Sequence, residues 1–119
     1  MNYVDGFVVP VTTSRMAEYK RMAAKSAKVW MEWGALEYVE CVADDVKPGK
    51  RTSFPQSVKL KADETVVFAY VVYKSRKHRD QVMAKVMKDP RMAAMMEVKD
   101  LPFNPQRMFF GGFKTLVKA

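Results

Sequence analysis

The chain has 119 residues, of which 49% are hydrophobic and 29% charged, and its formal net charge is +8. This length favours one domain over residues 1–119 whose core needs no metal or disulfide, and the composition excludes a disordered chain. The sequence contains no apolar run of about 18 residues, the length that a membrane-spanning helix needs. One cysteine cannot form an internal disulfide and no signal-peptide pattern opens the chain, so we expect a cytoplasmic protein.

The chain opens with a strand pattern over residues 1–11. Residues 15–33 then carry apolar side chains at helical spacing, with charged residues on the opposite side. We expect a hydroxyl of Thr13 or Ser14 to cap the start of this helix, and Gly34 to end it in a left-handed conformation.

Strand patterns continue through the middle of the chain. Residues 35–43 alternate as a second strand, and residues 65–73 form the clearest strand, because their apolar residues follow without interruption. The segment 46–63 between them is the least regular part. It is either a functional loop or holds a short strand over residues 57–61.

The last third begins with a helix over residues 76–88, capped by Ser75. Asp89-Pro90 has the composition of a new helix start, and this short helix continues to Met96.

The final strand is expected over residues 107–117. Gly111-Gly112 interrupts it, which indicates a bulge or a close approach of another group. The order strand, helix, strand, strand, helix, strand predicts an α+β, ferredoxin-like βαββαβ fold with a four-stranded antiparallel sheet and helices on one face.

The alternation within each strand predicts two different sheet faces. We expect the small and aliphatic residues to lie under the helices: Val4, Gly6, Val8, Val39, Cys41, Ala43, Val67, Ala69 and Val71. The opposite face then carries Tyr3, Asp5, Phe7, Tyr38, Glu40, Phe68 and Tyr70. An aromatic face is unfavourable in water, so we expect a homodimer packed sheet to sheet. The alternative is that the segment 46–63 covers this face.

The residues of that face are also the candidates for a ligand cleft: Asp5, Tyr38, Glu40 and Tyr70, with Arg107 as a possible anion contact. Asp5 and Glu40 are expected on one face with the third strand between theirs. A carboxylate among aromatic rings has a raised pKa and can act as an acid or base. The simpler interpretation is that each carboxylate pairs with a neighbouring arginine, tyrosine or backbone group.

Other reactive side chains have weaker support. Cys41 is expected to pack inertly under the helices, and His78 to lie on the surface. No paired-histidine or paired-cysteine spacing and no glycine-rich nucleotide loop is present, so no metal or cofactor is predicted. The basic run over residues 74–79 could bind anions with Lys47, Lys50 and Arg51. It lacks interleaved aromatic residues, so nucleic acid is not the favoured partner.

Four segments carry a family resemblance: residues 3–10, 34–41, 53–56 and 85–92. They resemble the YbaA-like bacterial family, a domain-of-unknown-function family, and the similarity extends over essentially the whole chain, including residues 107–113. The resemblance implies the dimeric α/β-barrel superfamily, in which ferredoxin-like subunits pair through their sheets. It implies no established activity and no catalytic residues, although related superfamily members include cofactor-free monooxygenases and stress-responsive proteins.

Three functions therefore remain open at this stage, and the sequence does not decide whether the protein is an enzyme. The first is binding of a small, partly aromatic or anionic ligand in the barrel cleft. The second is catalysis of the cofactor-independent monooxygenase or isomerase type. The third is a non-catalytic stress-associated or RNA-binding role through the basic surface.

Overall fold

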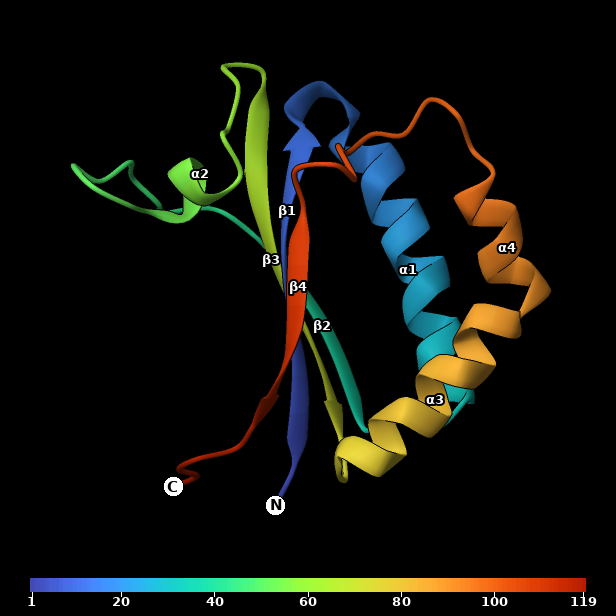
Figure 1. Ribbon diagram of the computed structural model, residues 1–119. Coiled ribbons are helices and arrows are strands. Elements are labelled where there is room, and N and C mark those ends of the chain that lie inside the picture. The colour runs from blue at the N-terminus through green and yellow to red at the C-terminus, as the bar shows by residue number, and fades with distance from the viewer.

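A computed structural model of residues 1–119 contains one four-stranded antiparallel sheet, with its strands in the order β2-β3-β1-β4. The strands are β1 (Tyr3–Thr12), β2 (Glu37–Val42), β3 (Glu64–Tyr73) and β4 (Phe109–Lys114). Helices α1 (Met16–Glu32), α3 (Arg76–Lys88) and α4 (Pro90–Met96) lie on one side of the sheet (Figure 1). The predicted ferredoxin-like fold is confirmed. None of the helices has the length and apolar character needed to span a membrane.

Most predicted helix ends are confirmed. Gly34 has a φ of +111°, the left-handed conformation that ends α1. The side-chain oxygens of Ser75 and Asp89 accept hydrogen bonds from the backbone N–H groups of His78 (3.1 Å) and Arg91 (2.9 Å), which caps α3 and α4.

The start of the first helix differs from the prediction. Thr13 and Ser14 lie in a 3₁₀ turn, η1 (Thr13–Arg15), and neither of them caps α1 with its side chain. This turn carries Arg15 into position to bond the Glu18 carboxylate (2.9 Å) and the Leu101 carbonyl (2.9 Å). Arg15 therefore occupies the N-cap position of α1, and no side chain caps this helix.

The irregular segment holds a helical turn instead of the short strand considered over residues 57–61. Ser53 caps α2 (Phe54–Ser57) by accepting from the N–H of Gln56 at 3.2 Å. The chain then turns at Lys59, which has a φ of +48°, and Val58 is buried against Val8 and Val66. The segment therefore covers one end of the sheet face opposite the three larger helices, and leaves the rest of that face open (Figure 1).

Strand pairing corrects the predicted faces of β1 and β2. Val67, Ala69 and Val71 are buried, as expected for residues under the helices. The register places Asp5 opposite Val71 and Glu40 opposite Ala69, and paired residues point to the same face. Tyr3, Asp5, Phe7, Tyr38 and Glu40 therefore face the helices, while Val4, Gly6, Val8, Val39 and Cys41 face the other way.

The error has a physical cause. Residue size predicts the face of each strand separately, whereas the register fixes the faces of all the strands together. Large side chains fit under the helices because α1 and α4 do not pack tightly on the sheet, and because Arg79 of α3 reaches Asp5. Cys41 is consequently exposed rather than packed under the helices.

The open face of the sheet carries exposed aromatic rings. Phe68, Phe109 and Phe113 are 43%, 46% and 64% exposed. The β1–β4 ladder runs from Tyr3 opposite Lys114 to Val8 opposite Phe109 without a bulge, so that part of the prediction is wrong. The alternative, a close approach, holds at Gly112, which lies against the Tyr3 ring.

Candidate functional site

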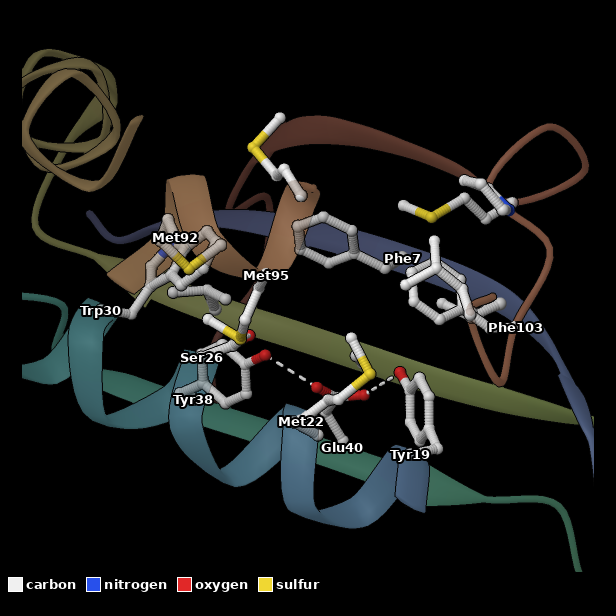
Figure 2. Close-up of a pocket in the computed structure, with 18 residues that line it drawn as sticks. Phe7, Tyr19, Met22, Ser26, Trp30, Tyr38, Glu40, Met92, Met95 and Phe103 are labelled. Carbon is white, nitrogen blue, oxygen red and sulfur yellow. Dashed lines mark hydrogen bonds between the residues drawn. The ribbon is translucent and has the colours of Figure 1, made fainter. Parts of the chain in front are cut away.

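A cavity of about 420 Å³ lies between the helix-facing side of the sheet, α1, α4 and the segment that leads into β4 (Figure 2). Fifteen of its 18 lining residues are hydrophobic. Five of them are methionines: Met22, Met92, Met95, Met96 and Met108. Because methionine is flexible and polarisable, such walls can adapt to the shape of a bound molecule.

Glu40 is the only carboxylate that lines this cavity. Its two oxygens accept hydrogen bonds from two phenols, one from Tyr19 of α1 and one from Tyr38 at 2.7 Å (Figure 2). The alternation of β2 places Tyr38 and Glu40 on the same face, and the apolar stripe of α1 directs Tyr19 toward them. Burial raises the pKa of both tyrosines, and the charge of Glu40 raises it further, so both phenols keep their protons and act as donors.

Further aromatic rings contact the two tyrosines that bind this carboxylate. Trp30 lies 5.7 Å from the Tyr38 ring, and Phe103 meets Tyr19 edge to face at 5.8 Å. The Ser26 hydroxyl donates to the Met95 sulfur at 3.7 Å. The site thus offers an apolar, aromatic pocket with one carboxylate, which can orient a molecule or accept a proton from it.

The five residues proposed from the sequence do not come together. Tyr38 and Glu40 line the cavity, whereas Asp5, Tyr70 and Arg107 do not. Asp5 and Glu40 share a face with β3 between their strands, as expected, but their surroundings differ.

Asp5 belongs to a buried ion pair. It is 3% exposed, and its carboxylate lies 2.7 Å from the Arg79 guanidinium. Burial raises the pKa of Asp5, while Arg79 and the Tyr73 hydroxyl oppose the rise. The Arg79 guanidinium also stacks 5.0 Å above the Tyr3 ring. The simpler sequence-based interpretation, in which the carboxylate is paired with an arginine, holds at this position.

Tyr70 and Arg107 lie outside the cavity for different reasons. Tyr70 faces the open side of the sheet, beside Phe68 at 6.3 Å. Arg107 bonds the Glu64 carboxylate at 2.9 Å and the Val58 carbonyl at 2.9 Å. The hydrogen bond from Arg107 lowers the pKa of Glu64. The guanidinium therefore links the turn at Val58 to the start of β3, and these bonds leave it unavailable to a ligand anion.

The cavity also has lining residues that are not among the sequence-predicted site candidates, including Tyr19, Ser26, Trp30, Met95 and Phe103. The sequence indicates some of these residues, because Tyr19, Ala23 and Trp30 share the apolar stripe predicted for the first helix. Small residues on that stripe leave room above the sheet. No sequence pattern predicts that Phe103 lines the cavity, because this residue lies in the irregular connection between α4 and β4.

The structure contains no group of three His, Cys, Asp or Glu side chains that could hold a metal ion. His78 accepts a hydrogen bond from the Lys74 N–H through Nδ1 at 2.9 Å, and its ring contacts Tyr73 edge to face. These contacts lie at the start of α3, and His78 does not line the cavity.

These features define a ferredoxin-like α+β protein with an apolar pocket between its sheet and helices. The chain belongs to the DUF1428 family of proteins of unknown function, whose family model matches residues 2–105. It is 45% identical over 117 residues to a protein described as uncharacterized protein YbaA from Escherichia coli K12, and the match covers 98% of each chain.

Solved structures share the fold at low sequence identity. SnoaB, a cofactor-independent oxygenase from Streptomyces nogalater, is 14% identical, with a TM-score of 0.61 over 98% of this chain and 95% of that one. A dimeric ferredoxin-like protein from an uncultured marine organism is 12% identical, with a TM-score of 0.61 over the whole of both chains.

Proposed function

We propose that this protein binds a small, largely apolar molecule in the cavity between α1, α4 and the sheet. The observation that carries this proposal is an apolar enclosure of about 420 Å³ with one carboxylate held between two phenols. Ligand pockets typically measure about 300–1,000 Å³ and combine apolar walls with a few convergent polar groups. This proposal differs from the sequence-based hypothesis of a ligand in the barrel cleft, because the cavity lies within one subunit.

Filling the cavity tests this proposal. Ala23 lines it from α1, so Ala23→Phe is expected to weaken binding of the neutral fluorescent probe N-phenyl-1-naphthylamine at least about tenfold, because the new ring occupies the binding volume. Probe fluorescence in a titration measures the dissociation constant, and Trp30 in the wall offers an intrinsic signal.

The neighbouring residue provides the matched control. Ala24 is exposed on the same helix, so Ala24→Phe adds the same ring outside the cavity and should bind the probe as the wild type does. Equal affinity of the Ala23→Phe and Ala24→Phe variants, or no saturable binding to the wild type, contradicts the proposal.

A second candidate function is catalysis of proton transfer, as in an isomerase or in the first step of a cofactor-independent oxygenase. It is favoured by one observation: Glu40 borders the cavity and accepts hydrogen bonds from two phenols, so a bound weak acid would find a positioned base. SnoaB, with a similar fold, is described as such an oxygenase. Exchange of ligand hydrogen with deuterated solvent separates this function from simple binding.

We also propose that two copies pair through their open sheet faces. Phe68, Phe109 and Phe113 are exposed there, and exposed aromatic patches mark interaction surfaces. The marine ferredoxin-like protein with the same fold is described as dimeric.

Charge introduced on this face tests the pairing. Phe113→Glu is expected to convert a dimer into a monomer in light scattering, because an interface anchor contributes about 2 kcal/mol or more. Met87→Glu, at a 47% exposed position on α3, should leave the mass unchanged. A wild-type monomer at micromolar concentration contradicts the proposed dimer.

A further inference from the structure

The charge of Glu40 has no counter-ion in the structure. No lysine, arginine or histidine lines the cavity, and Glu40 takes part in none of the ion pairs formed by the chain. Its partners, Tyr19 and Tyr38, are neutral donors. They stabilise the ionised carboxylate without neutralising it.

The hydrogen bonds of Glu40 are also incomplete. A carboxylate offers about four lone-pair positions, and the two phenols use one on each oxygen. The unused lone-pair positions can accept further hydrogen bonds, and Glu40 borders the cavity. A ligand can therefore donate to Glu40 without displacing either tyrosine.

The walls near Glu40 suit a positive charge. The rings of Phe7, Trp30 and Phe103 line the same enclosure as the two tyrosines (Figure 2). Aromatic faces attract cations, and methionine sulfurs add polarisable surface. An anionic ligand would be repelled by Glu40 and would meet no basic side chain in the lining, although the whole chain has a net charge of +8. That surface charge is screened beyond about 8 Å at physiological ionic strength.

We infer that the ligand of this cavity is a lipophilic cation, an apolar aromatic or alicyclic molecule with one protonated amine that pairs with Glu40. This inference depends on the binding function proposed above for the same cavity. The cavity should accordingly bind an amine more tightly than a neutral alcohol or a carboxylic acid of the same shape.

Three ligands with one ring system test the inference: 1-naphthylmethylamine, 1-naphthalenemethanol and 1-naphthoic acid. Each competes with N-phenyl-1-naphthylamine in the wild-type protein at neutral pH. The amine should bind about tenfold more tightly than the alcohol, since both partners of its bond to Glu40 are charged whereas the alcohol is neutral, and the acid should bind most weakly. An alcohol that binds as tightly as the amine overturns the inference.

Two variants assign the preference to one residue. Glu40→Gln should bind the amine and the alcohol equally while it still binds the neutral probe. Glu37→Gln removes one charge from the same strand at an exposed position, so it should retain the amine preference. An amine preference that survives in Glu40→Gln overturns the inference, and the ligand comparison in the wild type decides the question even if this variant fails to fold. Absence of probe binding by the wild type would instead contradict the proposed binding function.

Discussion

Replacement of Arg79 by methionine is expected to lower the free energy of unfolding by about 2–4 kcal/mol at neutral pH, because it leaves the Asp5 carboxylate buried without its cation. Asp5 is 3% exposed and its ion pair with Arg79 measures 2.7 Å. The Arg79 side chain is itself 21% exposed, which places the loss below that of a fully buried pair. Methionine keeps most of the apolar contact with Tyr3, so the lost charge accounts for the effect.

The pH dependence of this loss has a defined sign. Burial already holds the pKa of Asp5 above its usual value of 3.8, and Arg79 is the strongest opposing group. Without Arg79 the pKa rises further, so the folded state retains a proton that the unfolded chain releases. Stability then falls as the pH rises from about 3.8 through the folded pKa of Asp5. The deficit of the variant should therefore be largest at neutral pH and shrink on acidification.

Urea unfolding of wild type and Arg79→Met at several pH values, at one protein concentration, measures this difference. The comparison is made at each pH because Glu64, whose pKa is lowered, loses its own stabilising contribution as the pH falls below about 4.5. Arg76→Met, at an exposed position of the same helix, should change stability by less than about 0.5 kcal/mol. Adding Asp5→Asn to Arg79→Met should restore part of the loss. A deficit that is independent of pH contradicts the role assigned to Asp5.

The secondary structure followed from local signals. Gly34, Ser75 and Asp89 act on neighbouring backbone groups, so their roles can be recognised without knowledge of the fold. The start of α1 differs from the prediction because a 3₁₀ turn precedes it, and Arg15 of this turn bonds the carbonyl of Leu101, a distant residue whose position no local pattern specifies.

The sheet faces depended on information that alternation alone lacks. Alternation separates Asp5 from Val4 but does not say which of the two meets the helices. The register with β3 decides it, because Ala69 and Val71 face the helices and pair with Glu40 and Asp5. For the same reason Cys41 lies on the open face and not in the predicted core, and Tyr38 and Glu40 line the cavity under the helices.

Asp5 and Glu40 show why one sheet face can hold two different carboxylates. Asp5 lies where α3 supplies Arg79, so its charge is matched within the chain. Glu40 lies where α1 supplies only Tyr19, so its charge is solvated by phenols and remains unmatched. The difference arises from the helix above each carboxylate, and it separates a structural acid from a candidate site.

The same buried pair explains the Gly112 position and gives the second large prediction. The φ angle of Gly112 is not in the left-handed region, so space, and not backbone conformation, requires glycine there. A Cβ at this position would lie 2.7 Å from Cε2 of Tyr3 and 2.9 Å from Nη1 of Arg79. Tyr3 is buried, and Arg79 is held by Asp5, so neither can move without breaking a contact.

Gly112→Ala is therefore expected to lower the free energy of unfolding by about 2–3 kcal/mol in urea titrations, as an overpacked core residue does. The adjacent glycine is the matched control, because a Cβ at Gly111 meets only the Phe113 ring at an ordinary 3.8 Å. Gly111→Ala should stay within about 0.5 kcal/mol of the wild type. In an Arg79→Met background the added cost of Gly112→Ala should shrink, because one of the obstructing groups is gone and the sites are in contact. Equal effects of the two alanines, or full additivity with Arg79→Met, would show that Gly112 does not support the Tyr3–Arg79–Asp5 cluster.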